Sequence, residues 1–284
     1  MGHQRRFIVL MLTPALMFYG VLVAIPGVRA LSLSVQKWDG LGESEWAGLA
    51  NFRALLQDEL FLAALSHNAI LCFVAGGITI GLSLAFAAMM HRRIRGAGLF
   101  RVAFFFPNVI ATVAVAVLWV LLYNTTEFGL VNAVLEKFVS TLSIDSLADS
   151  VPFPFTDSRY LIWSLVPMMV WTAVGFYMVL FLAAMQGIPE SYYEAARLDG
   201  ATSMQQFRHV TLPMIREVLL VGVVFFLISS AKLFDSVWVM ENQYPTKDSH
   251  VMATLLYQKI FTEYDVGYGA AVAVLLFVIV LMGT

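Results

Sequence analysis

Long apolar segments alternate with short polar segments along the whole chain. A helix needs about 20 apolar residues to cross a hydrocarbon core of about 30 Å. Six segments meet this requirement, and they are residues 7–28, 69–90, 102–123, 160–185, 218–240 and 266–284. The second, third and fourth contain no charged side chain, and the fifth contains two. The pattern therefore predicts an all-α polytopic membrane protein with six transmembrane helices in a single domain over residues 1–284.

The first and last apolar segments bear on processing of the chain. Arg5 and Arg6 precede the first segment, as in a secretory signal peptide. Its apolar run is too long for a signal and lacks a clear small-residue cleavage pattern, so we expect a retained signal anchor. The last segment is still apolar at Thr284 and has no basic flank. We therefore expect the natural chain to continue beyond this residue.

Composition supports a membrane location and argues against one class of partner. Hydrophobic residues make up 60% of the chain and charged residues 13%, and the mean hydropathy is +0.80. Soluble domains contain about 25% charged residues, so the lipid bilayer is the expected environment. The formal net charge is -2, and no basic face indicates nucleic-acid binding. The single cysteine, Cys72, lies in an apolar run and cannot form an internal disulfide.

Basic residues in the loops predict the orientation in the membrane, because Lys and Arg concentrate on the cytoplasmic side. The polar segments at 1–6, 91–101 and 187–217 carry nine arginines. The loops of the opposite side are about twice as long in total and carry six Lys or Arg residues. We therefore expect both termini and residues 187–217 to lie in the cytoplasm.

Residues 188–213 are predicted to form a polar hairpin between the fourth and fifth spans. Pro189 opens the first helix at a position that needs no intrahelical N–H. Gly200 ends that helix, because glycine readily adopts the left-handed backbone that a tight reversal requires. The small side chains of Ala195 and Ala196 would let another backbone approach this helix closely.

A second short helix is predicted to follow the reversal. Ser203 and Gln206 have the spacing of a capping box, in which each side chain bonds to the backbone of the other. We expect this helix to end near His209, before Pro213.

The hairpin sequence resembles the signature loop of ATP-binding-cassette importer permeases. The shared pattern is E-A-A, three residues, G, nine residues and I-x-L-P, with Val210 where the family usually has Ile. In that family the loop is a coupling helix that docks on a cytoplasmic ATPase subunit. The resemblance assigns this role to Glu194, Ala195, Ala196, Asp199, Gly200, Leu212 and Pro213. The alternative interpretation is an amphipathic hairpin without a partner.

Other segments resemble the carbohydrate-uptake branch of this family, which includes maltose and glycerol-3-phosphate permeases. The matching residues are Gly48 to Phe52, Asp58, Phe61, Phe105 to Pro107, Trp119, Tyr123, Gly129, Asn132, Phe234, Asp235, Tyr257, Phe261, Gly267, Tyr268, Ala270 and Ala271. Residues 240–245 depart from the pattern, because many relatives have several glycines and a Gly-Pro here. The resemblance therefore identifies the type of subunit better than the cargo.

The resemblance implies an assembly and a location. The expected fold is that of a type I importer permease in the cytoplasmic (inner) membrane of a bacterium or archaeon. The expected partners are two ATPase subunits, a second permease subunit and an extracytoplasmic substrate-binding protein. ATP and Mg²⁺ would bind to the ATPase subunits and not to this chain. The expected cargo is a sugar, with a di- or oligosaccharide preferred, moved by alternating access.

Two charged residues lie inside the fifth predicted span. Lys232 and Asp235 are three residues apart and would share a helix face. Charges at the centre of a membrane cost about 2.5–3.5 kcal/mol on insertion scales, so they are candidate functional residues. At about 1.5 Å per residue, Lys232 lies in the outer third of the span. Its ammonium group could therefore extend to the interface without any role in transport.

Three further residues are candidates for the cargo pathway. Trp171 lies near the middle of the fourth span, and an aromatic face can stack against the C–H groups of a sugar ring. Ser229 and Ser230, at comparable depth in the fifth span, could bond to sugar hydroxyls. The alternative, which we favour, is helix packing for the tryptophan and hydrogen bonds to the preceding turn for the serines.

The sequence argues against catalysis by this chain alone. It contains no G-x-x-x-x-G-K-[ST] loop that would hold nucleotide phosphates, and its five histidines lack metal-ligand spacing. We therefore expect a transport subunit that is not an enzyme and binds no cofactor or metal. Two rival functions are an ion-gradient-driven transporter or channel with Lys232 and Asp235 as its relay, and a membrane scaffold that recruits a soluble partner.

Overall fold

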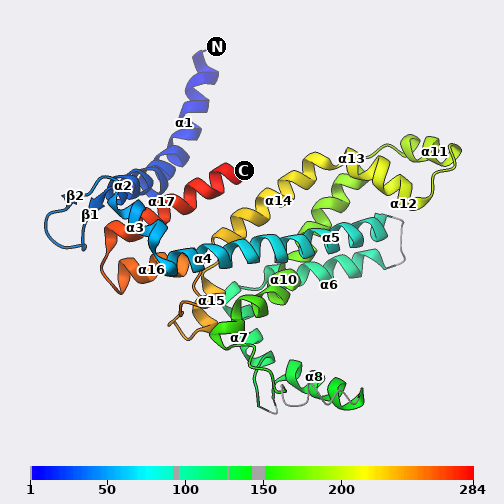
Figure 1. The fold of residues 1–284 in the computed structure, drawn as a ribbon. Coiled ribbons are helices and arrows are strands. Elements are labelled where there is room, and N and C mark those ends of the chain that lie inside the picture. Colours follow the sequence, from blue (N-terminus) through cyan, green and yellow to red (C-terminus); the bar gives the residue numbers. More distant parts are fainter. Residues whose placement is uncertain (1, 92–95, 127, 143–150) are drawn as a thin grey trace. The chain divides into compact units, whose positions relative to one another are not determined.

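The computed structural model spans residues 1–284 and describes all of them except 1, 92–95, 127 and 143–150. Most of the described residues are helical (Figure 1). The described chain contains five helices that are long and apolar enough to cross a membrane, or six if one bent pair counts as a single span. This agrees with the predicted all-α membrane protein.

Contacts divide the chain into two compact units. Unit 1 comprises residues 1–62 and 252–282, and unit 2 comprises residues 63–251 and 283–284. The expectation of a single domain over 1–284 stays a prediction.

Unit 1 contains the helices at the two ends of the chain and a short β-hairpin. Its elements are α1 (Gly2–Tyr19), η1 (Gly20–Ala24), α2 (Ile25–Ser34), β1 (Gln36–Lys37), β2 (Glu45–Trp46), α3 (Ala50–Gln57), the start of α4 (Glu59–Ile70), α16 (Met252–Phe261) and most of α17 (Val266–Gly283). Strands β1 and β2 are antiparallel, with Gln36 opposite Trp46. The helices α1, η1 and α2 form one continuous helical run that covers the first predicted span.

A close backbone contact fixes the start of α17 in unit 1. A Cβ atom on Gly267 would lie 2.1 Å from the Gln36 carbonyl oxygen, so only glycine fits here. The Asn51 side chain donates hydrogen bonds to the carbonyls of Ser34 (2.9 Å) and Gln36 (2.8 Å). The Tyr268 hydroxyl donates to the Asp58 carboxylate. Four of the residues that carry the sequence resemblance therefore hold α3, β1 and α17 together.

Unit 2 contains the remaining helices, arranged around α10. Its elements are the rest of α4, η2 (Leu71–Ala75), α5 (Gly76–His91), α6 (Ala97–Val109), α7 (Thr112–Leu122), α8 (Leu130–Thr141), α10 (Ser158–Gln186), α11 (Glu190–Leu198), α12 (Ser203–Gln206), η3 (Phe207–Thr211), α13 (Leu212–Met214), α14 (Arg216–Ala231) and α15 (Asp235–Met240). Helix α10 packs mainly against α5 and α6. Figure 1 shows α11 and α12 at one end of this unit and α7 and α15 at the other.

Close contacts with α10 fix its two main neighbours. A Cβ atom on Gly175 would lie 1.9 Å from the Phe104 carbonyl oxygen, so the backbones of α10 and α6 touch at this point. The Ser83 hydroxyl in α5 donates to the Val174 carbonyl at 2.9 Å. Small residues at a helix contact allow such packing in membranes, where apolar burial does not draw helices together.

The third predicted span is not one continuous helix. Helices α6 and α7 meet at an angle of 98°, because Ile110 and Ala111 adopt extended backbone with ψ of 138° and 133°. Pro107 lies in the last turn of α6 and has no N–H to donate, which weakens that turn. The proline at position 107 predicts a kink in this span, and the structure shows a break between Val109 and Thr112, just after that residue.

The fifth predicted span is also interrupted, and the interruption separates its two charges. Lys232 is the C-cap of α14, whereas Asp235 is the first residue of α15. Both are exposed, and the described residues show no ion pair between them. The prediction that they share a helix face is wrong. Each charge instead complements the dipole of its own helix, the lysine at a C-terminus and the aspartate at an N-terminus.

Candidate functional site

The first candidate site is the hairpin formed by α11 and α12. Pro189 is the N-cap of α11, Glu190 lies in its first turn and Arg197 in its last. Acidic and basic residues at these ends complement the helix dipole. The Arg197 guanidinium also pairs with the Glu190 carboxylate on the exposed surface of the helix.

The reversal after α11 has the geometry that the sequence predicted. Gly200 has a φ of +79°. The Gly200 N–H donates to the Arg197 carbonyl at 3.0 Å, and the Ala201 N–H donates to the Ala196 carbonyl at 2.9 Å. These two bonds define a Schellman motif, in which a left-handed residue satisfies the last carbonyls of the helix.

The cap of α12 lies one residue earlier than predicted. Thr202, and not Ser203, is the N-cap, and Gln205 completes the capping box. The Thr202 N–H donates to the Gln205 Oε1 at 2.7 Å, and the Gln205 N–H donates to the Thr202 Oγ1 at 3.4 Å. The pair of Ser203 and Gln206 and the pair of Thr202 and Gln205 have the same capping-box spacing. Thr202 is the N-cap because its backbone is extended (ψ 163°), as an N-cap residue requires.

The helical run after α12 is longer than predicted. It continues through the π-helical turn η3 into α13, which ends at Met214. Pro213 lies in the first turn of α13, where a missing N–H is tolerated. The prediction that the helix ends near His209 is therefore wrong. Single π-helical turns occur often at functional sites, and this one joins the hairpin to the fifth span.

A buried contact fixes the hairpin to this π-helical turn. The hydroxyls of Tyr193 in α11 and Thr211 in η3 are 3.0 Å apart and form a hydrogen bond. Both residues are buried, and the ring of His91, at the end of α5, lies 5.6 Å from the Tyr193 ring. Tyr193 therefore contacts the ends of two spans, although the sequence analysis did not single it out.

The predicted coupling residues lie mostly on the open side of the hairpin. Glu194, Ala195, Asp199, Gly200 and Pro213 are exposed, whereas Ala196 and Leu212 are half-buried. Leu198 and Met204 flank the reversal with 89% and 72% of their surface exposed. These two apolar side chains lie beside the reversal in a segment that is otherwise mostly polar. Their place in a mostly polar segment is a sequence signal for a contact surface.

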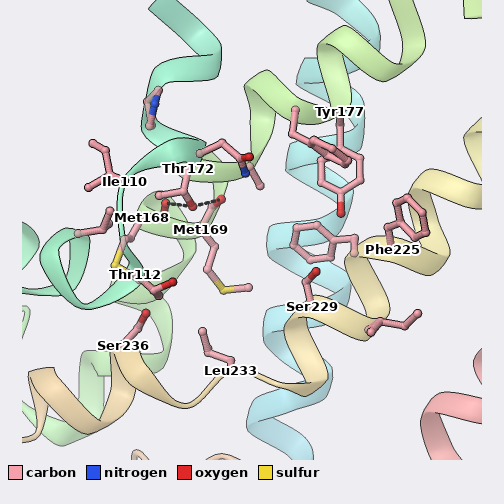
Figure 2. A pocket seen from close by; sticks show the side chains of 17 residues that line it. Ile110, Thr112, Met168, Met169, Thr172, Tyr177, Phe225, Ser229, Leu233 and Ser236 are labelled. Atoms are coloured by element: carbon pink, nitrogen blue, oxygen red, sulfur yellow. Dashed lines mark hydrogen bonds between the residues drawn. The ribbon is translucent and has the colours of Figure 1, made fainter. Parts of the chain in front are cut away.

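The second candidate site is a cavity of about 570 Å³ in unit 2, lined by residues of α6, α7, α10, α14 and α15 and of the segments between them. The lining residues are Pro107, Asn108, Ile110, Thr112, Val115, Met168, Met169, Thr172, Ala173, Phe176, Tyr177, Phe225, Phe226, Ile228, Ser229, Leu233 and Ser236. Figure 2 shows Thr112 and Ser236 toward one side of the cavity and Ser229 and Phe225 toward the other.

The two interrupted spans meet at this cavity. Ile110 and Thr112 belong to the break between α6 and α7, and Leu233 and Ser236 flank the break between α14 and α15. The helices α7 and α15, which follow the two breaks, also pack against each other. Irregular backbone at membrane depth is tolerated where it lines a cavity or is buried in protein. The positions of both breaks therefore indicate a functional cavity.

Of the residues predicted for the cargo pathway, only Ser229 lines the cavity. Ser230 is buried, its hydroxyl donates to the Leu227 carbonyl (3.0 Å), and its own carbonyl accepts a bond from Asn68. Back-bonding, the interpretation we favoured, therefore holds for Ser230.

Trp171, Lys232 and Asp235 also lie outside the cavity lining. The Trp171 ring packs edge-on against Trp119, with centroids 6.2 Å apart. This contact agrees with the packing interpretation of the tryptophan.

The segment after α15 contains two non-glycine residues in a left-handed backbone conformation. Asn242 and Gln243 both have positive φ, 51° and 70°. Asn242 tolerates this conformation better than most residues. The neighbouring Glu241 carboxylate accepts a bond from the Ser158 hydroxyl at 3.0 Å. Burial raises the pKa of the Glu241 carboxyl, and the nearby Asp157 raises it further, against the effect of bonds from Ser249 and Ser158.

Comparison with known proteins places this architecture in a family. The family described as "binding-protein-dependent transport system inner membrane component" matches residues 77–283. A probable ABC transporter permease of Bacillus subtilis is 33% identical over 291 residues, covering 99% of this chain and 94% of the relative. Another from Pyrococcus horikoshii is 30% identical over 279 residues, covering 97% and 92%. The trehalose/maltose permease MalF of Thermococcus litoralis is 28% identical over 276 residues, covering 97% and 90%.

Solved structures share the same fold. A chain of a bacterial ABC transporter that imports the acidic polysaccharide alginate matches with a TM-score of 0.77 and 23% identity, covering 99% of this chain and 94% of that one. The same kind of transporter in complex with an alginate-pentasaccharide-bound periplasmic protein matches with a TM-score of 0.79 and 22% identity, covering 99% and 93%. These matches confirm the predicted importer-permease fold.

Proposed function

Because this chain belongs to the family of binding-protein-dependent transport system inner membrane components, we propose that it is the membrane-spanning subunit of an ATP-driven carbohydrate importer. The observation that carries the proposal is the pairing of a rigid, exposed hairpin with a cavity between interrupted spans. The first suits a contact with a motor subunit. The second suits the passage of a cargo. The similarity to a trehalose/maltose permease favours a di- or oligosaccharide as that cargo.

The hairpin is proposed to receive the motion of an ATPase subunit. Leu198 and Met204 would enter an apolar groove on that subunit, and the small side chains of Ala195 and Ala196 would allow close approach. The hydrogen bond between Tyr193 and Thr211 would pass the displacement to η3 and the fifth span. A helix pair fixed at both caps is suited to this role because it moves as one body.

The cavity is proposed to open alternately to each side of the membrane. ATP binding at the ATPase pair would shift the equilibrium between the two states, and so would a loaded binding protein. Each ligand can do so only through a difference in affinity for the two states. The assembly would contain two ATPase subunits that hold ATP and Mg²⁺, a second permease subunit and an extracytoplasmic binding protein. This chain would hold no cofactor, with its N-terminus and the hairpin in the cytoplasm.

The helix break between Lys232 and Asp235 weakens the alternative of an ion-gradient-driven transporter or channel. That alternative relied on Lys232 and Asp235 as a relay, and the helix break places these residues on separate helices. Interrupted spans also occur in secondary transporters, so the breaks alone do not separate the two classes. The family match over residues 77–283 favours the ATP-driven importer.

Reconstitution separates these alternatives. The permease pair, the ATPase and the binding protein would be placed in proteoliposomes, and uptake of radiolabelled maltose, trehalose and diacetylchitobiose would be measured. We expect uptake of at least one of these sugars with ATP on the hairpin side and none with a non-hydrolysable analogue. Ionophores should leave the rate unchanged. Uptake driven by an ion gradient without ATP would overturn the proposal.

A further inference from the structure

Among the residues that the structure describes, those that line the cavity of unit 2 carry no charged group. None of the seventeen lining residues is Lys, Arg, His, Asp or Glu. An ionic group that leaves water for such a cavity loses hydration without gaining a countercharge, which is strongly unfavourable. The composition of the lining therefore discriminates between charged and uncharged cargo.

Hydroxyl groups and the Asn108 side-chain amide supply the polar side-chain groups of the lining. Ser229 and Ser236 present two of these groups, and the buried Ser236 Oγ has no hydrogen-bond partner among the described residues. Thr112 lies in the first turn of α7, whose N-terminus has no side-chain cap. Thr172 is different, because its hydroxyl already donates to the carbonyls of Met168 and Met169 (Figure 2). Unused hydroxyls and backbone N–H groups suit a cargo that both donates and accepts hydrogen bonds.

Aromatic side chains form much of the remaining lining. Phe176 and Tyr177 come from α10, and Phe225 and Phe226 come from α14. Tyr177 contacts two of the other rings, with centroids 5.2 Å from Phe176 and 5.9 Å from Phe226. Its hydroxyl points into the cavity (Figure 2). Apolar ring faces beside isolated hydroxyls match a sugar ring, which has apolar C–H faces and a hydroxyl edge.

We propose that this cavity accepts an uncharged, hydroxyl-rich cargo and rejects carboxylated or phosphorylated sugars. The inference rests on the proposed function and narrows it to neutral oligosaccharides. The volume of about 570 Å³ lies within the range of about 300–1,000 Å³ that ligand sites usually have. Ser229, Ser236 and Thr112 would bond to cargo hydroxyls, and the aromatic residues would contact the ring faces.

The N-terminus of α7 is the part of the cavity lining that would bind an anion best. A helix N-terminus carries about half a positive charge, and its effect falls off within the first turn. A carboxylate or phosphate carries one or two full charges, so it would remain largely uncompensated here. A hydroxyl oxygen can accept hydrogen bonds from the same N–H groups and carries no charge that needs compensation.

Cysteine accessibility tests the proposal in the assembled transporter. Cys72 is the only cysteine of the chain, so Cys72→Ser gives a cysteine-free permease. Ser229→Cys then places a thiol in the cavity lining, and the adjacent Ser230→Cys places a matched control thiol in a buried site outside it. Each variant would be reacted with an anionic and a cationic methanethiosulfonate. Protection would be tested with maltotriose, diacetylchitobiose, digalacturonate and glycerol 3-phosphate.

We expect Ser229→Cys to react at least tenfold faster than Ser230→Cys. A neutral oligosaccharide should slow that reaction at least threefold, whereas digalacturonate and glycerol 3-phosphate should have no effect. Protection by an acidic probe equal to or greater than that by every neutral probe would overturn the inference and leave the importer function standing. No protection by any probe, together with no ATP-dependent carbohydrate uptake, would overturn the proposed function and the inference with it.

Discussion

The hairpin and the cavity are built by different kinds of interaction. The hairpin owes its shape to residues within a few positions of one another, such as the Schellman motif at Gly200 and the capping box of Thr202 and Gln205. The cavity is lined by residues of five helices and depends on two interrupted spans. Interactions between residues close in sequence therefore determine the hairpin, which would contact the ATPase subunit. Packing between helices distant in sequence determines the cavity, which would contact the cargo.

This difference predicts that each region can be damaged while the other stays intact. The largest expected effect is on the packing that supports the cavity. Gly175→Ala would place a methyl group 1.9 Å from the Phe104 carbonyl, so α6 and α10 must separate. Overpacking costs typically about 1–3 kcal/mol, and a backbone contact cannot relax by a rotamer change. We expect a marked fall in thermal stability in detergent.

The matched control for this change is Gly81→Ala in α5, where a Cβ atom would meet nothing within 4 Å. We expect this control to keep the wild-type unfolding temperature. An unchanged unfolding temperature for Gly175→Ala would show that the contact between α6 and α10 is not rigid.

The hairpin should fail in a different manner. Gly200→Asp puts a side chain at a φ of +79°, which distorts the reversal, and adds a charge to the exposed face. We expect ATP-dependent uptake to fall at least tenfold while ATP hydrolysis and membrane insertion remain. Labelling of Ser229→Cys in the cavity should continue in this background. Normal uptake by the variant would contradict the coupling role of the hairpin.

The connection between the two regions should give a smaller effect. Tyr193→Phe removes one hydroxyl and its bond to Thr211, and such a bond contributes about 0.5–1.5 kcal/mol. We expect uptake per ATP hydrolysed to fall about threefold, with the unfolding temperature slightly lower. Tyr192→Phe, on the exposed side of the same helix, is the control and should match the wild type. Equal uptake per ATP hydrolysed in both variants would show that the Tyr193 hydroxyl does not connect the hairpin to the fifth span.

The smallest expected effect is in the segment after α15. Because burial raises the pKa of the Glu241 carboxyl, the folded state favours its protonated form. This contribution to stability is complete at acidic pH and is lost as the pH rises through the raised pKa. Glu241→Gln should therefore unfold at the wild-type temperature in acid and at a higher temperature near neutral pH. Thermal unfolding between pH 4 and pH 8 measures this difference.

Asp248→Asn changes an exposed carboxylate in the same segment and serves as the control. We expect it to keep the pH profile of the wild type. A Glu241→Gln profile parallel to that of the wild type would show that burial of the carboxyl has no consequence for stability.

Much of the architecture could be predicted from the sequence, because it follows from local signals. The approximate positions of the long apolar helices follow from apolar length, and the left-handed residue at Gly200 follows from the place of glycine after a helix. The error at Ser203 is also local. Thr202 and Ser203 can each begin a capping box, and only the backbone conformation at Thr202 distinguishes them.

The cavity could not be predicted, because its lining depends on where helices stop. The third span has no charged residue, and although Pro107 predicts a kink, nothing in the sequence marks Ile110 and Ala111 as extended. The spacing of Lys232 and Asp235 predicts one pair on one helix, whereas they lie at the ends of two helices. Ser229 and Ser230 are identical neighbours, and tertiary contacts alone decide that the first lines the cavity and the second bonds to its own helix.

The interrupted third span has a consequence for hydration. The first turn of α7 leaves N–H groups without a side-chain cap, and a membrane interior offers them no other partner. We therefore expect water to occupy the cavity whenever cargo does not. Each sugar hydroxyl that enters would replace a water molecule bond for bond, so the step gains little enthalpy and needs no drying of the lining. A cargo without hydroxyl groups would displace these water molecules and would not replace their hydrogen bonds to the lining.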